Sequence, residues 1–458
     1  MIPIFPFIRV CVCSLTLPIP IMTEQAKKEK KKPENLVIPP KKPKLSKAER
    51  RALQEAQRAA KAGPPPPTPT PLKLPQKQES MKLESKETTS STTTTRQQTL
   101  KNIQDDMAFS LFSHLPPYHH EPMRNISAAA NYAHLHPAVL QLGQMYSQGI
   151  IRGGNARCRA MLGVFHQLVS DYNPPLEDSS TRDLRHHLDQ TVLKPSFTYW
   201  TEHCRPHSVS MGNAFTFLKS AVASLDRDIE LEALKKILGQ TIQAYIQERM
   251  DFAHVAICEH ASSKIVDGDV LLVYGHSEVI VQLLVMQKEQ LKKTFRVIVV
   301  DGRPLLEGRR MLESLKKANV MCSYILLNCI SYVMKDVTKV LLGAAALMSD
   351  GSVLGRVGTA CVALSSQRKA VLVCCETYKI SNRVQLESIT GNELGDPKCV
   401  YAGEKEENLR MLNLLYDLTP SNYISGIVTE MGILPPTSVA VLLREMNPHE
   451  TMTDTSVL

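Results

Sequence analysis

The segment DVLLVYGHSEVIVQLLVMQKEQLKKTFRVIVVDG, residues 269–302, contains two short apolar runs separated by a longer segment. The runs DVLLVYG and FRVIVVDG have the length of strands, whereas SEVIVQLLVMQKEQLKK between them has the length of a helix. Strands that are buried on both faces show no polar–apolar alternation, and the helices that connect them cover the two faces of a parallel sheet. The segment therefore predicts one β–α–β unit of a parallel sheet.

The same alternation continues toward the C-terminus. Four further apolar runs of strand length follow, namely CSYILLN, KVLLGAAAL, AVLVCCE and YISGIVTE. Upstream of residue 266, apolar residues recur at three- and four-residue spacing, which is the periodicity of helices. We therefore predict an α/β protein in three parts: a disordered, basic and proline-rich tail over residues 1–102, a helical domain over 103–265 and a parallel-sheet domain over 266–458.

The net charge of +9 belongs to the tail. Residues 1–100 contain 19 Lys and Arg against 8 Asp and Glu, whereas the remainder contains 35 against 37. A near-neutral folded part argues against a basic nucleic-acid groove across the domains. We expect the tail to be solvated, and weak contact with RNA or ribosomes through SKAERRALQEAQRAAKA (46–62) is the alternative.

The eleven cysteines follow no paired spacing, and no CxxC motif occurs. Such usage is typical of buried thiols in a reducing compartment. His254, Cys258 and His260 are close in sequence, but only the first two share a helix face, so we expect no metal site. Residues 1–22 are apolar but contain four prolines and no basic leader, so we expect neither a signal peptide nor a membrane span. The sequence predicts a cytosolic protein without a cofactor.

Polar residues follow several of the predicted strands, at Gly275–Glu278, Asp301–Arg303, Ser349–Arg356 and Glu376–Lys379. Ligands of parallel sheets bind beyond the carboxyl ends of the strands, so these residues are candidates for a site. The glycines of GSVLGRVGT (351–359) are typical of a tight loop that cradles phosphate. However, neither a dinucleotide fingerprint nor a GK[ST] phosphate loop occurs.

Several longer motifs carry a resemblance to a known family. They are CRPHSVSMGNAFTFLK (204–219), RVIVVDGRPLLEGRRML (296–312), SDGSVLGRVGT (349–359), VLVCCETYKISNRVQ (371–385) and NELGDP (392–397). Over residues 105–447 the chain resembles the alpha, beta and delta subunits of eukaryotic translation initiation factor 2B. The segments CRPHSVSMGNA and CCETYK resemble the delta members more than the alpha and beta members.

The resemblance implies a helical domain followed by a Rossmann-like domain, and a role without catalysis. In this family, alpha, beta and delta form a hexameric regulatory core that holds two copies of gamma and epsilon, which gives a decamer. The assembly exchanges GDP for GTP on initiation factor 2, and epsilon carries the catalysis. The serine-phosphorylated alpha subunit of factor 2 binds the core and inhibits exchange, which is the integrated stress response. The resemblance therefore implies a cytosolic scaffold and regulatory subunit that helps to sense this phosphorylated partner.

The family is similar to sugar-phosphate isomerases, and that likeness implies a vestigial site. The isomerases' catalytic cysteine corresponds to Gly275 and their catalytic aspartate to Ala345, so the pair of groups that moves protons is missing. Arg356 stands where the isomerases have a lysine. The expected vestigial ligand loop comprises Gly275, His276, Ser277, Gly351, Arg356, Gly358 and Thr359. A sugar-phosphate-binding, isomerase-like protein remains the alternative function.

Two groups of residues are candidates for partner contacts. Guanidinium groups suit phosphate, so the candidates for contact with the phosphorylated alpha subunit are Arg152, Arg157, Arg159 and Arg205. Exposed apolar residues suit a subunit interface, for which the candidates are Leu111, Phe112, Ile380, Leu414 and Leu415. Ion pairing on the surface and packing within the chain are the open alternatives for these two groups.

Overall fold

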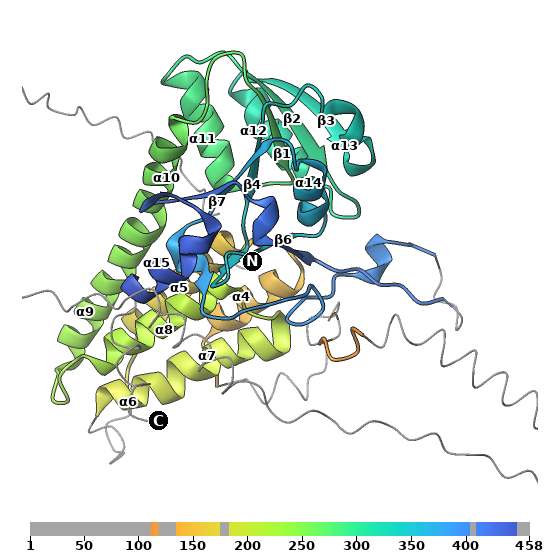
Figure 1. Ribbon diagram of the computed structural model, residues 1–458. Coiled ribbons are helices and arrows are strands. Elements are labelled where there is room, and N and C mark those ends of the chain that lie inside the picture. Colours follow the sequence, from red (N-terminus) through yellow and green to blue (C-terminus); the bar gives the residue numbers. More distant parts are fainter. Residues whose placement is uncertain (1–110, 117, 119–133, 175–182, 404–408, 447–458) are drawn as a thin grey trace, which may run out of the picture. The chain divides into compact units, whose positions relative to one another are not determined.

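The computed structural model describes residues 111–116, 118, 134–174, 183–403 and 409–446. The predicted tail over 1–102 lies outside these residues. Figure 1 shows a helical region and then a sheet flanked by helices, as the alternation of apolar runs predicts. The α/β fold class is therefore confirmed. None of the described helices is long and apolar enough to cross a membrane.

The helical region packs around Trp200. The indole N–H of Trp200 donates to the carbonyl oxygen of Val139 at 2.9 Å, and the ring meets Phe165 edge to face at 5.2 Å between centroids. A buried indole needs such a partner for its N–H group. The helices of this region are α4 (Pro137–Ser147), α5 (Gly154–Asp171), α6 (Leu184–Leu188), α7 (Lys194–Thr198), α8 (Val209–Ala223), α9 (Leu231–Ala244) and α10 (Ala253–Ser262).

One continuous helix joins the helical region to the sheet. The π-helical segment Tyr245–Phe252 links α9 to α10 without a break in the helix. Leu238 of α9 is buried in the core of the helical region, whereas Ile257 of α10 is buried in the core on one face of the sheet. The same helix therefore contributes to two hydrophobic cores.

The main sheet has the strand order β11-β10-β7-β4-β1-β2-β3, and only β11 runs antiparallel to its neighbour. The order reverses between β1 and β4, which is the switch point where sheets of this kind bind ligands. The strands are β1 (Val270–Tyr274), β2 (Arg296–Asp301), β3 (Met321–Leu326), β4 (Lys339–Gly343), β7 (Ala370–Cys374), β10 (Gly426–Thr429) and β11 (Gly432–Leu434).

Helices cover both faces of this sheet. Leu271 and Val273 of β1 pack on the face formed with α10, α11 (Glu278–Glu289) and α12 (Gly308–Lys317). Leu272 and Tyr274 point to the other face, which is covered by α13 (Ile330–Val333), α14 (Thr359–Ser365) and α15 (Val439–Met446). Burial on both faces explains why the central strands are almost wholly apolar.

A second, smaller sheet was not predicted. The apolar run KVLLGAAAL forms two strands in different sheets, because the chain leaves β4 at Gly343 and begins β5 at Ala346. The small sheet has the order β8-β5-β6-β9, with β8 (Ile380–Ser381), β5 (Ala346–Met348), β6 (Val353–Arg356) and β9 (Tyr416–Thr419). Part of the predicted glycine loop is therefore strand β6.

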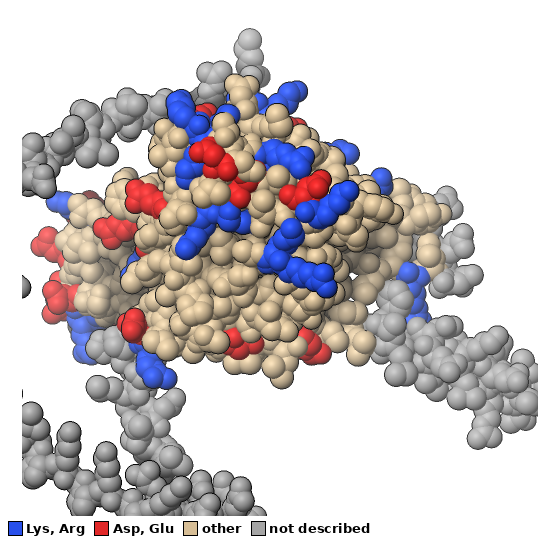
Figure 2. All heavy atoms as spheres, turned by 45° about the horizontal axis from the view of Figure 1, so that its top comes forward, with Lys and Arg blue, Asp and Glu red and all other residues tan. Residues whose placement is uncertain are grey.

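Charged side chains are mixed in sign on the face shown in Figure 2. Lys and Arg lie interspersed with Asp and Glu there, and no single basic field covers that face. This arrangement agrees with the near-neutral charge expected for the folded part.

Candidate functional site

A cavity of about 230 Å³ lies between the helical region and the loops at the carboxyl ends of the strands. The end of α4, the turn Cys204–Pro206, the loop after β2, the end of β6 and the segment 393–396 form its walls. A smaller cavity adjoins it and shares Leu305, Glu307, Arg356 and Leu415. Its other walls include Tyr274 and Gly275 at the end of β1.

Arg205 enters the main cavity from the turn that follows the π-helical segment Tyr199–Cys204. Both its Nε and Nη2 donate to the carboxylate of Glu393, the latter at 3.3 Å. Burial works against the charge of Arg205, but the carboxylate of Glu393 raises its pKa above the usual range. Beneath this pair, Arg157 donates to the backbone carbonyl oxygens of Arg205 at 3.4 Å and of Pro206 at 2.5 Å, and so holds the turn in place.

Arg356 enters the same cavity from the end of β6. Its Nε lies 2.9 Å from one carboxylate oxygen of Glu307, and its Nη2 donates to the other at 3.1 Å. The guanidinium carbon lies 5.1 Å from the centre of the Tyr416 ring, in a cation–π arrangement. The Nη1 atom of Arg356 is buried and has no hydrogen-bond partner among the described residues.

The amide groups of the glycine loop are already bonded within the chain. Asp417 of β9 accepts hydrogen bonds from the backbone N–H of Gly358 at 2.7 Å and of Ala360 at 3.0 Å. Gly358 has a φ of +102°, and a Cβ at this position would lie 2.1 Å from the Tyr274 hydroxyl oxygen. Tyr274 also donates to the carbonyl oxygen of Val357. Asp417 therefore occupies the amide donors that an anion cradled by this loop would need.

The switch point between β1 and β4 is closely packed. A Cβ on Gly343 would lie 2.6 Å from the Ser277 hydroxyl oxygen, so Ser277 fits here only because residue 343 is glycine. Ser277 precedes α11, as the sequence predicts, but its side chain makes no capping hydrogen bond. Its neighbour His276 is partly buried, and burial lowers the pKa of that imidazole.

The structure brings together only part of the predicted ligand loop. Gly275 and Arg356 line the smaller cavity, and Gly358 and Thr359 lie two and three residues after Arg356 in the chain. Gly351 lies elsewhere, in the turn between β5 and β6, where a Cβ would lie 2.4 Å from the carbonyl oxygen of Pro436. Its role there is to allow a φ of +80° and close packing.

The four candidate arginines have different surroundings. Arg152 is exposed on the wall of the main cavity, and Arg205 lines the same cavity in its pair with Glu393. Arg159 is exposed and paired with Asp251. Arg157 is only 1% exposed, so it has no surface to offer a partner, and its expected role in phosphoserine contact is corrected to a structural one.

The candidates for a subunit interface fall into an exposed or partly exposed group and a buried group. Leu111 is 53% exposed and Phe112 is partly exposed, whereas Leu414 lines the smaller cavity. Ile380 and Leu415 are 3% and 7% exposed, so these two pack within the chain instead of offering an apolar surface to a partner.

A second cluster of charged groups is buried just after the C-terminal end of β7. Glu376 is fully buried, and it accepts hydrogen bonds from His254 Nε2 and Asn155 Nδ2, both at 2.7 Å. Lys379 Nζ lies 2.6 Å from its other carboxylate oxygen and donates to the carbonyl oxygen of Ala344 at 3.1 Å. Burial works against the charge, but the ammonium of Lys379 and the imidazole of His254 hold the pKa of Glu376 below its usual range.

The cysteines and histidines near the sheet serve packing and hydrogen bonding. Burial raises the pKa of Cys374 to about 12, which argues against a nucleophilic thiolate. His254 bonds to Glu376, and His260 bonds to the carbonyl oxygen of Thr429. Within the described part of the chain, no three His, Cys, Asp or Glu side chains are grouped so as to hold a metal ion.

Sequence reasoning missed the acidic residues of the cavity. Glu307 and Glu393 both lie within the quoted motifs RVIVVDGRPLLEGRRML and NELGDP, but neither directly follows a strand. Their significance comes from the arginines that they face, Arg356 and Arg205. Their position inside the quoted motifs is the signal that the sequence offers for them.

Comparison with known proteins identifies relatives over most of the chain. Residues 150–436 match the model of the initiation factor 2 subunit family. The chain is 34% identical to translation initiation factor eIF2B subunit delta of Schizosaccharomyces pombe, over 89% of this chain and 91% of that protein. It is 39% identical to the Dictyostelium discoideum subunit delta over 77% of this chain, but spans only 58% of that relative's length.

One structural relative and one enzyme relative complete the comparison. The crystal structure of the tetrameric eIF2B-beta2-delta2 complex from C. thermophilum matches with a TM-score of 0.61 and 30% identity, over 70% of this chain and 97% of that chain. Ribose 1,5-bisphosphate isomerase of Pyrococcus furiosus is 29% identical over 57% of this chain and 85% of the enzyme.

Proposed function

Because this chain belongs to the initiation factor 2 subunit family, we propose that it is a regulatory and scaffolding subunit of the guanine-nucleotide exchange factor for translation initiation factor 2. The observation that carries the proposal is its likeness to a subunit delta over 89% of this chain and 91% of that relative. A likeness of this extent includes both the helical region and the sheet. The protein would act in the cytosol, where translation initiation takes place.

The proposed partners are the alpha, beta, gamma and epsilon subunits of the same exchange factor, in a decamer with two copies of each. The likeness to the tetrameric eIF2B-beta2-delta2 complex supports direct contact with beta. The exposed side chain of Leu111 and the partly exposed side chains of Phe112 and Leu414 are the remaining candidates for a subunit interface. Initiation factor 2 itself, with its phosphorylated alpha subunit, is the proposed regulatory partner. Arg152 and Arg159 are its proposed contacts, whereas the guanidinium group of Arg205 is occupied by Glu393.

The proposed subunit has no catalytic role. By the resemblance, Gly275 and Ala345 stand where the isomerases carry their catalytic thiol and carboxylate, so that pair of proton-moving groups is missing. The nearby cysteine Cys374 is buried with a raised pKa. Carboxyl groups do lie at the cavity, but Glu307 and Glu393 are each paired with an arginine.

A sugar-phosphate isomerase is the second candidate, since a cavity lies at the carboxyl ends of the strands and an isomerase relative matches 57% of the chain. Incubation of the purified chain with ribose 1,5-bisphosphate distinguishes the two functions. We expect no product above the rate without protein, and turnover would establish the enzyme.

Affinity purification of the tagged full-length chain from its own cells, followed by mass spectrometry, tests the proposed function. We expect four other subunits of the exchange factor in stoichiometric amounts, with initiation factor 2 in lower amounts. Recovery of the chain alone would contradict the proposal.

A further inference from the structure

The main cavity contains two arginine–glutamate pairs, Arg205 with Glu393 and Arg356 with Glu307. In each pair, two guanidinium nitrogens face both oxygens of one carboxylate. The four side chains are only 11–20% exposed. Each charge is therefore largely removed from water and balanced by a group of the same chain.

Arginine binds phosphate through the same two-nitrogen geometry that it uses for a carboxylate. Each glutamate thus occupies the guanidinium N–H groups to which a phosphate ester would bind. We infer that Glu393 and Glu307 act as built-in anions that close the guanidinium groups of Arg205 and Arg356 to phosphate esters. The inference rests on the proposed non-catalytic function and identifies the residues that keep these two buried arginines from serving as an anion site.

The charge of the walls supports the same conclusion. Three arginines line the cavity against four carboxylates, namely Arg152, Arg205 and Arg356 against Glu202, Glu307, Glu393 and Asp396. A phosphate ester carries a charge of about −1.5 to −2 at neutral pH. It would have to displace a carboxylate from an arginine and would then lie beside that displaced negative charge.

The arginines remain competent to bind an anion once a glutamate is neutralised. Arg157 fixes the turn that carries Arg205 through hydrogen bonds to two backbone carbonyl oxygens. The ring of Tyr416 lies beneath Arg356, and Nη1 of Arg356 is a buried donor without a partner among the described residues. Replacing either glutamate with glutamine therefore leaves a positioned guanidinium that faces a cavity of about 230 Å³.

Calorimetric titration of inorganic phosphate into the full-length chain, purified with its partner subunits, tests the inference. The variants are Glu393→Gln and Glu307→Gln, with Glu202→Gln as the matched control. Glu202 is exposed on the wall of the same cavity and has no lysine or arginine within 4.0 Å among the described residues. The thermal unfolding midpoint of each variant shows that it is folded, and two variants are used so that a folding defect in one leaves the other as a test.

We expect Glu393→Gln or Glu307→Gln to bind phosphate at least tenfold more tightly than the wild type and Glu202→Gln do. Adding Arg205→Ala to Glu393→Gln should remove the gain. The inference is overturned if the wild type binds phosphate as tightly as the variants, or if the folded variants show no gain. Recovery of the partner subunits is scored separately, so failure of the inference is distinguishable from failure of the proposed function.

Discussion

Glu376, which follows β7, accepts a hydrogen bond from His254 of α10 at 2.7 Å, so a buried hydrogen bond ties the parallel sheet to the long helix of the helical region. Lys379 balances the charge of Glu376, and Asn155 of α5 adds a further hydrogen bond. The segment CCETYK is therefore explained by how the sheet and the helices are joined, and no chemistry of the cysteines is needed.

Replacing Glu376 with Gln should destabilise the protein by about 3–5 kcal/mol, because Lys379 would remain buried without its counter-charge. Urea denaturation of the full-length chain measures the change. Glu289→Gln is the matched control, since Glu289 is exposed at the end of α11 and its replacement should cost less than about 0.5 kcal/mol. Equal unfolding midpoints for the two variants would show that the contacts of Glu376 contribute nothing to the stability of the protein.

Asp417 should make stability depend on pH in the direction opposite to that of an ordinary paired carboxylate. Burial raises the pKa of Asp417 to about 6, above its value of 3.8 in an unfolded chain. The folded state therefore holds this proton more tightly than the unfolded state, and its contribution to stability falls as pH rises from about 4 to about 6.

The Asp417→Asn variant isolates this effect, because an amide does not titrate and its oxygen still accepts from the amide groups of Gly358 and Ala360. Relative to the variant, the wild type should gain on the order of 1–2 kcal/mol of unfolding free energy when the pH is lowered from 6.5 to 4.5. Denaturant titrations at the two pH values provide the comparison. If the difference in unfolding free energy between the wild type and Asp417→Asn stays constant with pH, the pKa of Asp417 is not raised.

Replacing Gly358 with Ala should cost about 1–3 kcal/mol, because φ is +102° and the added methyl group would meet the Tyr274 hydroxyl. Gly163→Ala is the control with the opposite expected sign. Gly163 lies within α5, and no atom lies within 4 Å of a Cβ there, so alanine should stabilise the helix by about 0.5–1 kcal/mol. Thermal unfolding of both variants measures the two changes in stability. A Gly358→Ala variant as stable as the wild type would show that the loop tolerates other conformations.

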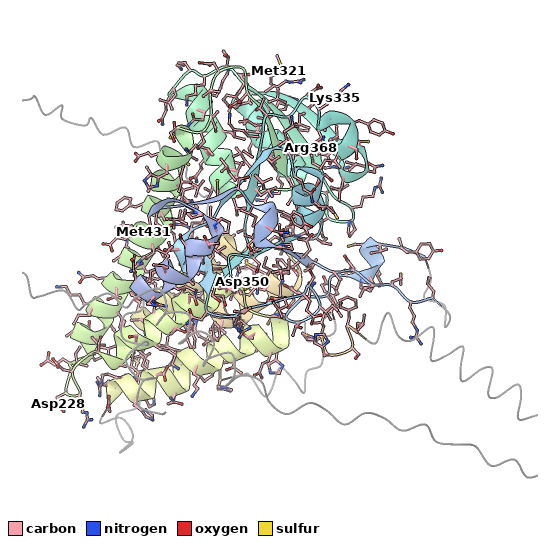
Figure 3. All side chains as sticks on the ribbon, viewed as in Figure 1. Asp228, Met321, Lys335, Asp350, Arg368 and Met431 are labelled. Atoms are coloured by element: carbon pink, nitrogen blue, oxygen red, sulfur yellow. The ribbon has the colours of Figure 1, made fainter. Side chains whose placement is uncertain are left out.

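The proposed contact of Arg152 with the phosphorylated alpha subunit of initiation factor 2 predicts a loss of binding on charge reversal. Arg152→Glu should weaken capture of the phosphorylated subunit roughly tenfold or more, since a charge-assisted hydrogen bond contributes about 1.5–3 kcal/mol. Arg368→Glu is the control, because Arg368 is exposed in the sheet region (Figure 3) and is not among the residues that line the cavity beside Arg152. Equal capture by both variants removes Arg152 from the proposed contacts.

The main sheet could be predicted because its central strands are buried on both faces. Runs such as DVLLVYG and FRVIVVDG are apolar throughout, and each contains a strand of the parallel sheet. The run KVLLGAAAL misled the prediction, because an apolar run does not show that the chain passes from one sheet to another at Gly343. The small sheet consists of strands of two to four residues, too short for their pattern to be distinctive.

The site could be predicted only in part, because its chemistry depends on residues far apart in the chain. The glycines and Arg356 could be singled out from one loop. The pair Arg205–Glu393 joins residues that are 188 positions apart, which no local pattern reveals. Likewise, Arg157 and Arg205 look alike in the sequence, and only the fold buries the first and turns the second into the cavity.

The rate of GDP release from initiation factor 2, measured with reconstituted exchange factor, tests the central claim most directly. With this chain present, we expect the complex to release GDP quickly and the phosphorylated alpha subunit to slow that release. Without this chain, the epsilon subunit should retain residual exchange activity that phosphorylation no longer slows. Full activity and full inhibition without the chain would contradict its role as a regulatory and scaffolding subunit.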